Sequence, residues 1–435
     1  MTEESLVKKI IVDRNKITIK AHSKLHKSYL IEDFYVEYNE EINLSNLDET
    51  ILIIPFVLNI APIVWMSGEE YIVNKIDKTL YESLSNLKEV FQGLYPSVQW
   101  NGDIKAKTIL DSNSAEYTNA DIEAGVLFSG GVDSLCTSFR NYDKKQLLIS
   151  ICGNDIDIKN KEGWLKVEKI NQDFANTYGH DYNSIKSNFR SFLNNLYLDQ
   201  VSPSIYNWWA KVQHGMGLIG LTAPLLEIKG INRLYISSTK TIENLVPWGS
   251  LPEIDENTRW NNTTITHDGF ELNRQDKIRE IIYACAANNL IKPTFRVCYA
   301  RPLGDGDNCC RCEKCLRTIT GLIIENQRIR EYGFNITEEQ AMKLVFKNFN
   351  HYKIKLNEDL EYVWSTLQIA LKNKNIELYD EQVKNYLIWL KEFDLGSYIK
   401  NYKKRTMLIE VIKKSIKNKP KIYNFCKKIK SSVGK

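Results

Sequence analysis

The sequence predicts an α/β protein built on a doubly wound parallel sheet, with an N-terminal α+β accessory domain and a C-terminal helical extension. Strand-like and helix-like segments alternate between residues 124 and 326, which is the rhythm of βαβ units. A glycine turn follows the first of these strands, where such sheets bind ligands. The chain has 435 residues, of which 43% are hydrophobic and 26% are charged, so it can form several soluble domains with large cores.

Residues 1–120 are expected to form the accessory domain. Apolar and polar residues alternate on both sides of a turn at residues 13–15, which predicts a hairpin over residues 9–20. Further strands are expected at residues 34–38, 51–58 and 71–73, and a helix at residues 76–94. Residues 111–121, rich in Asn and Ser, are the expected linker. This region carries no catalytic constellation.

The central domain is expected over residues 124–326. Its predicted strands are residues 125–129, 146–152, 183–187, 233–238, 263–267 and 294–298. Its predicted helices are residues 132–141, 162–178, 206–228, 274–288 and 313–326. Helical patterns continue through residues 327–400, so residues 327–435 form the predicted extension.

The most informative segment is a glycine turn between the first predicted strand of the central domain and its helix. It reads Ser129-Gly130-Gly131-Val132-Asp133-Ser134. Glycines let the backbone approach phosphates, and the N–H groups of a helix start face such anions. A carboxylate at Asp133 would repel phosphates unless Mg²⁺ bridges them. The alternative is an ordinary turn whose Asp133 and Ser134 cap the helix.

This string resembles the PP-loop of the ATP pyrophosphatase superfamily, and no Gly-Lys-Ser/Thr of a Walker loop follows it. The resemblance implies a PP-loop fold, ATP bound by Ser129 to Ser134, and cleavage between the α and β phosphates. Members of the superfamily adenylate a substrate oxygen, and a nitrogen or sulfur nucleophile then displaces AMP. Asp133 and Ser134 are the expected catalytic residues of the loop.

Five of the nine cysteines lie between Cys298 and Cys315. Cys298, Cys309, Cys312 and Cys315 offer four thiolates at a spacing that suits a tetrahedral Zn²⁺ site. Cys310 is a bystander or an alternative ligand. An iron–sulfur cluster and a persulfide-carrying Cys-x-x-Cys pair are the competing interpretations.

Loop and cysteines together resemble the 7-cyano-7-deazaguanine synthases of the queuosine pathway over residues 124–326. In that family the loop lies at the start of the domain, and a zinc site lies near its end, before a final helix. In this chain, Arg317 follows the last of the expected zinc ligands. Those shorter enzymes turn a carboxylate on a 7-deazapurine into a nitrile with ammonia and ATP. The additional regions make this chain similar to the longer synthase-like proteins found beside antiviral defence or surface-polysaccharide genes.

The expected function is therefore that of an ATP-dependent, AMP-forming ligase acting on a carboxylate. Arg274 and Lys277 open a predicted helix and are expected to stabilise the departing pyrophosphate, although they equally suit a solvated helix face. No glutaminase constellation is present, so ammonia or an amine comes from solution or from a partner protein. The alternatives are a tRNA sulfurtransferase-type enzyme and a non-catalytic nucleotide-binding component of a defence system.

Charge is distributed unevenly along the chain. Residues 401–435 hold twelve Lys and Arg but one acidic residue, a net charge of +11, whereas the preceding residues carry −7. The basic tail suits an amphipathic helix on anionic lipid or nucleic-acid phosphates, or a helix packed on the body with a frayed end. No signal peptide or membrane span is apparent, so we expect a cytoplasmic protein; a homodimer remains open.

Overall fold

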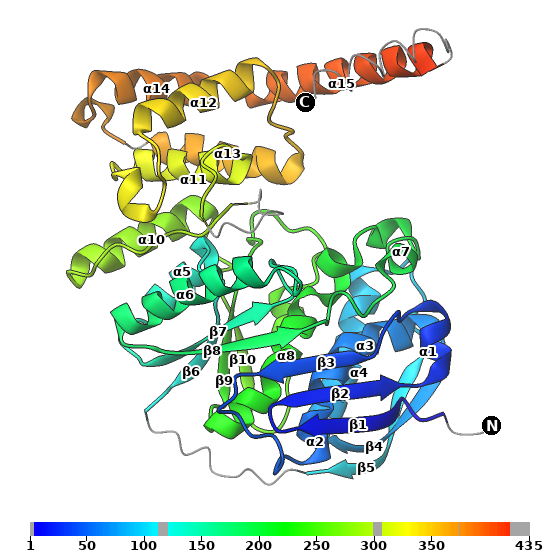
Figure 1. The fold of residues 1–435 in the computed structure, drawn as a ribbon. Helices are drawn as coiled ribbons and strands as arrows, with labels where there is room; N and C mark the ends of the chain where they lie inside the picture. The colour runs from blue at the N-terminus through cyan, green and yellow to red at the C-terminus, as the bar shows by residue number, and fades with distance from the viewer. Residues whose placement is uncertain (1–3, 112–120, 299–306, 373, 418–435) are drawn as a thin grey trace. The chain divides into compact units, whose positions relative to one another are not determined.

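The structure is a computed structural model that describes residues 4–111, 121–298, 307–372 and 374–417 (Figure 1). Contacts divide the chain into two compact units. The first comprises residues 1–309 and 330–334, and the second comprises residues 310–329 and 335–435. The expected linker at residues 111–121 falls mostly outside the described residues.

The first unit is built on an eight-stranded sheet with the order β1-β2-β3-β8-β7-β6-β9-β10, beside a two-stranded sheet of β4 and β5. The large sheet contains β1 (Val7–Asp13), β2 (Lys16–Ala21), β3 (Phe34–Tyr38), β6 (Ala124–Leu127), β7 (Gln146–Cys152), β8 (Asp181–Ser187), β9 (Arg233–Ser237) and β10 (Thr264–Asp268). The small sheet pairs β4 (Glu70–Asp77) with β5 (Asp103–Leu110) in parallel.

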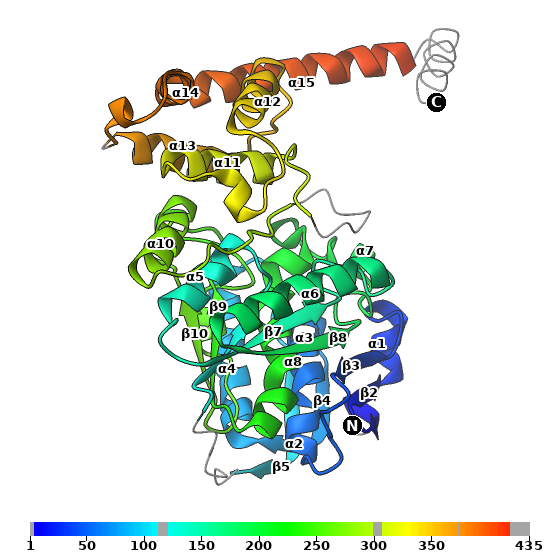
Figure 2. The ribbon, with the colours of Figure 1, turned by 60° about the vertical axis from the view of Figure 1, so that its left-hand side comes forward.

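Strands β8, β7, β6, β9 and β10 are all parallel, which confirms the predicted α/β class. The helices of this unit are α1 (Ser23–Ser28), α2 (Glu49–Leu52), α3 (Ile54–Ser67), α4 (Lys78–Leu94), α5 (Val132–Arg140), α6 (Lys161–Tyr178), α7 (Asn195–Leu198), α8 (His214–Lys229), α9 (Pro252–Asp255) and α10 (Arg274–Ala287). Helices α5 and α6 connect β6 to β7 and β7 to β8, whereas α8 leads back to β9 on the other side of β6 (Figure 2). The strand order therefore reverses between β6 and β9, which is compatible with a doubly wound fold.

The N-terminal segment belongs to this same unit and does not stand apart as the sequence suggested. β3 pairs antiparallel with β8, with Val36 opposite Ser187. The phenolic hydroxyl of Tyr38 donates to the carbonyl oxygen of Leu221 in α8 at 2.9 Å. Side chains of β2, β3, α3 and α8 share one buried core. Because β3 pairs with β8 and apolar side chains of β2 and β3 are buried in this common core, strands β1 to β3 extend the large sheet.

Two predicted strands are wrong. Residues 51–58 fall on α2 and α3, because a helix buried on all sides has the same unbroken apolar run as a buried strand. Residues 294–298 form no regular strand. The predicted hairpin and the remaining predicted strands correspond to β1 to β4 and β6 to β10, within a few residues at their ends.

The second unit is helical, as the sequence predicted for residues 327–400. It contains α11 (Glu313–Ile324), α12 (Glu338–Asn350), α13 (Glu358–Leu371), α14 (Glu381–Glu392) and α15 (Leu395–Lys417). Its core is aromatic: the Phe349 ring lies 4.9 Å from that of Trp364 and 5.1 Å from that of Tyr398. Within this core, Thr320 Oγ1 lies 2.8 Å from the hydroxyl of Tyr386, so these two buried hydroxyls satisfy each other.

Candidate nucleotide and metal sites

The glycine turn lies at the position where a doubly wound sheet binds its ligands. Residues 128–131 connect the carboxyl end of β6 to α5, and β6 lies at the point where the strand order reverses. At such a switch point the connections on either side of the crevice diverge, so ligands bind there. The fold thus brings the predicted anion loop to the carboxyl end of the sheet, at the reversal of strand order between β6 and β9.

The loop has an open, glycine-dependent conformation. Gly130 has φ +71°, a left-handed backbone that favours glycine. The backbone N–H of Ser129 donates to Ser134 Oγ at 3.2 Å, and the N–H of Gly131 donates to Ser129 Oγ at 3.3 Å. Gly131 is the N-cap of α5 and has no side chain, so the first-turn amides of this helix receive no hydrogen bond from a capping side chain.

Two cations from α10 meet the loop carboxylate. Arg274 Nη1 lies 3.5 Å from Asp133 Oδ2, and Lys277 Nζ lies 3.3 Å from Asp133 Oδ1. Lys277 also donates to the carbonyl oxygen of Ser238, just beyond β9, and its side chain is 3% exposed. The structure therefore brings Asp133 together with Arg274 and Lys277, each of which lies more than 140 positions from Asp133 in the sequence. The negative charge of Asp133 is compensated within the protein.

A third cation, Arg296, holds the loop from its other side, and the sequence did not reveal it. Its Nε donates to the carbonyl oxygen of Ser129 at 2.6 Å, and its backbone N–H donates to that of Gly130 at 2.8 Å. Arg296 lies in the segment that was predicted as a strand. No motif marks this position, although it stands two residues before Cys298.

Asn171 of α6 also faces the loop. Its Nδ2 donates to Ser150 Oγ at 2.9 Å, and Ser150 Oγ donates to the carbonyl oxygen of Phe128 at 2.8 Å. A Cβ placed on Gly130 would come within 2.7 Å of Asn171 Oδ1. The absence of a side chain at Gly130 is thus required both by its φ angle and by this neighbour.

Burial keeps two histidines of the first unit neutral near pH 7. Desolvation lowers the pKa of His180 to about 4, and the same cause lowers the pKa of His214 to about 4. His180 Nδ1 accepts the backbone N–H of Gln146 at 3.4 Å. The His214 ring lies 4.8 Å from the ring of Trp209. These two rings are therefore acceptors or packing groups and not cations.

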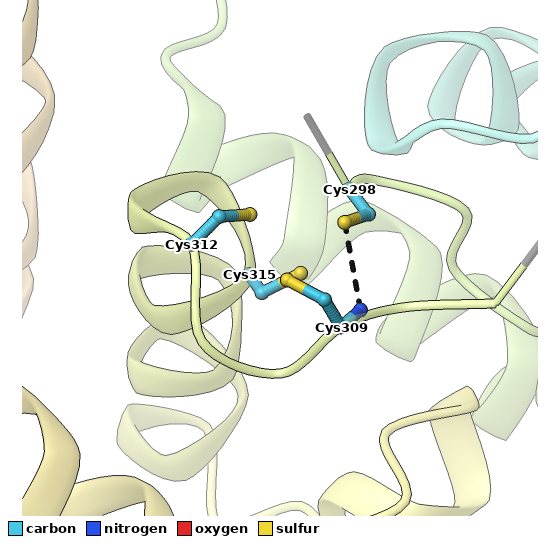
Figure 3. Close-up of side chains that lie close together, drawn as sticks. All are labelled: Cys298, Cys309, Cys312 and Cys315. Carbon is cyan, nitrogen blue, oxygen red and sulfur yellow. Dashed lines mark hydrogen bonds between the residues drawn. The ribbon is translucent and has the colours of Figure 1, made fainter. Parts of the chain in front are cut away.

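The four predicted cysteine ligands converge (Figure 3). The sulfur atoms of Cys298, Cys309, Cys312 and Cys315 all lie within 4.8 Å of one another. Sulfur atoms bound tetrahedrally to one zinc ion are about 3.8 Å apart, given Zn–S bonds of about 2.3 Å. The cluster can therefore hold a metal ion such as zinc, and its compactness suits one ion better than thiolates spread over several iron atoms.

The backbone around these cysteines suits bound thiolates. The N–H of Cys309 donates to Cys298 Sγ at 3.5 Å, which stabilises negative charge on that sulfur. Cys310 has φ +54° and turns the chain between Cys309 and Cys312. Cys310 is not among the four converging sulfurs. Arg317, which follows the last cysteine, lies 3.7 Å from Glu313.

Comparison of the chain with protein-family models, with curated proteins and with solved structures found no match. None of the helices in the described ranges combines the length and apolar character that a membrane span requires. Most of the basic tail, residues 418–435, lies outside the described residues.

Proposed function

We propose that this protein is a PP-loop ATP-dependent C–N ligase, similar to 7-cyano-7-deazaguanine synthase, that adenylates a carboxylate for attack by ammonia or an amine. The observation that carries the proposal is the convergence of Arg274, Lys277 and Arg296 on a glycine loop at the reversal of strand order. An ordinary capping turn needs no such concentration of cations.

The triphosphate of ATP would lie against residues 129–134. The backbone N–H groups and the hydroxyls of Ser129 and Ser134 supply donors, and Lys277 and Arg274 supply positive charge. Mg²⁺ accompanies the nucleotide in this proposal. Asp133 would hold this ion, in exchange for part of its pairing with Arg274 and Lys277.

The reaction begins when a carboxylate oxygen attacks the α-phosphorus. A new P–O bond forms, the bond between the α-phosphorus and the bridging oxygen breaks, and pyrophosphate leaves with its electron pair. Ammonia or an amine then adds to the acyl carbon, AMP departs, and a proton is lost from nitrogen to give an amide. A second ATP would adenylate the amide oxygen, with loss of pyrophosphate and of one proton from nitrogen. Departure of AMP and loss of the second proton from nitrogen would then leave a nitrile. Lys277 and Arg274 stabilise the charge that develops on pyrophosphate.

The zinc ion of this proposal is structural. All four ligands come from the protein, and a closed four-thiolate shell leaves no position for a substrate. The same closed shell favours nitrogen transfer over the sulfurtransferase alternative, because a persulfide carrier needs an accessible sulfur.

The decisive experiment measures exchange of labelled pyrophosphate into ATP with a panel of carboxylic acids, followed by AMP formation with ammonium. We expect exchange with at least one acid, and a loss of at least about a hundredfold in Lys277→Met and Asp133→Asn. Lys144→Met is the matched control, since Lys144 pairs with Glu123 at the protein surface. Formation of ADP instead of AMP would refute the proposal. Nucleotide binding without exchange would favour a non-catalytic component.

The proposal also includes three kinds of partner. Residues 401–435 would contact nucleic acid or an anionic membrane, a partner protein would deliver nitrogen, and a second copy of the chain would form a homodimer. The cluster of basic residues supports the first of them.

A further inference from the structure

The segment that leads into the first cysteine ligand is fixed to the phosphate loop. Phe295, Arg296 and Val297 precede Cys298 directly. The N–H of Val297 donates to Asn308 Oδ1 at 3.1 Å, and Asn308 Nδ2 donates to the carbonyl oxygen of Phe295 at 2.6 Å. Asn308 itself precedes Cys309. Asn308, the residue before Cys309, therefore clamps the residues on both sides of Arg296.

Arg296 contacts two consecutive peptide groups of the loop. Its Nε holds the carbonyl oxygen of Ser129, and its backbone N–H holds that of Gly130. In a trans peptide the C=O and the following N–H point in opposite directions. Both carbonyls turn toward Arg296, so the N–H groups of Gly130 and Gly131 turn away from it, and the N–H of Gly131 donates to Ser129 Oγ at 3.3 Å. Successive N–H groups aimed to one side form an anion-binding concavity.

The Arg296 side chain is buried, is held in place by its neighbours and carries a positive charge. The side chain is 4% exposed, and Nη2 lies 3.7 Å from the carboxylate of Asp155. Nη1 is buried and has no hydrogen-bond partner among the residues that the structure describes. A guanidinium held at Nε keeps the donors of its other nitrogens in one plane. Arg296 thus sets the loop geometry and adds positive charge beside the phosphate site.

We propose that Arg296 couples the cysteine site to the phosphate loop. A metal ion that joins Cys298 to Cys309 also fixes the position of Asn308. Asn308 in turn holds Arg296 in place. Arg296 then fixes the orientation of the peptide groups at Gly130 and Gly131. Metal occupancy therefore raises the affinity for nucleotide phosphates, and by thermodynamic reciprocity a bound nucleotide raises the affinity for the metal. Arg296 acts here as a positioning residue. The part concerning ATP rests on the proposed function.

The first test follows zinc transfer from the loaded, full-length protein to a colorimetric chelator, with and without ATP. We expect ATP to slow the transfer about tenfold in the wild type, within the usual range of coupling between sites. Arg296→Met should abolish this slowing. Lys277→Met should weaken ATP binding, yet saturating ATP should still slow the transfer. Arg190→Met is the matched control, because Arg190 donates to the carbonyl oxygen of Asn154 instead of to the loop.

The second test needs no nucleotide. Amide hydrogen exchange of the peptide covering residues 125–134 is compared before and after zinc removal, and we expect faster exchange in the zinc-free protein. Arg296→Met should show fast exchange in both states. If ATP binds but does not affect zinc transfer, or if loop exchange ignores zinc, the coupling is refuted. If zinc controls loop exchange while ATP fails to bind, the coupling stands and the proposed function fails.

Discussion

The substitution Gly130→Ala tests the left-handed backbone of the loop and its close approach to Asn171. An alanine at φ +71° carries left-handed strain of about 1–2 kcal/mol. Its Cβ would also lie 2.7 Å from Asn171 Oδ1, which is anchored through Ser150 and therefore yields poorly. Such overpacking adds about 1–3 kcal/mol. We expect Gly130→Ala to lower the free energy of unfolding by about 3 kcal/mol.

Two other glycines supply matched controls. Gly179 has φ +73°, and a Cβ there would meet nothing within 4 Å, so Gly179→Ala should cost only the strain, about 1–2 kcal/mol. Gly131 has φ −83°, and a Cβ there would lie 3.3 Å from Ser129 Oγ, so Gly131→Ala should cost less than about 1 kcal/mol.

The measurement is urea unfolding followed by tryptophan fluorescence, with equal m-values required for comparison. Asn171→Ala in the Gly130→Ala background should recover the part of the loss that comes from overpacking. If Gly130→Ala destabilises the protein no more than Gly179→Ala does, the approach of Asn171 to the loop is refuted.

Two further predictions concern the cysteines and the histidines. The purified protein should contain one zinc ion per chain by elemental analysis; Cys312→Ser should lose it and melt at a lower temperature, whereas Cys310→Ser should retain it. The pKa of His180 falls from 6.5 to about 4 on folding, so the unfolded chain binds more protons between these pH values. The contribution of neutral His180 to the free energy of unfolding is therefore complete above about pH 6.5. It decreases toward pH 4, by up to about 3 kcal/mol. His180→Asn, whose amide oxygen can replace Nδ1 as acceptor for Gln146, should flatten the dependence of unfolding free energy on pH over that range, and an unchanged profile would contradict the assignment.

The helices and strands of the central region could be predicted because their patterns are local. The predictions failed at residues 51–58 and 294–298 because a local pattern does not show which partners a segment will have. An unbroken apolar run does not distinguish a fully buried helix from a buried strand. The segment around Arg296 is extended, but its backbone N–H bonds to the loop carbonyl of Gly130 and not to a neighbouring strand of the sheet.

The position of the N-terminal region could not be predicted from its own residues. The alternation in β2 and β3 predicts strands with one buried face, yet it does not say which element covers that face. Only the pairing of β3 with β8 and the shared core with α8 decide that these strands extend the large sheet.

The sequence by itself determined the local chemistry: a glycine loop before a helix, four thiols at metal-ligand spacing, and a central region of alternating strands and helices. These features depend on residues within one turn or a few positions of each other. The tertiary structure alone decided that Lys277 and Arg274 meet Asp133, and that Arg296 binds the loop carbonyls of Ser129 and Gly130. Such contacts join segments more than a hundred residues apart, and strand order, which no local pattern encodes, brings them together.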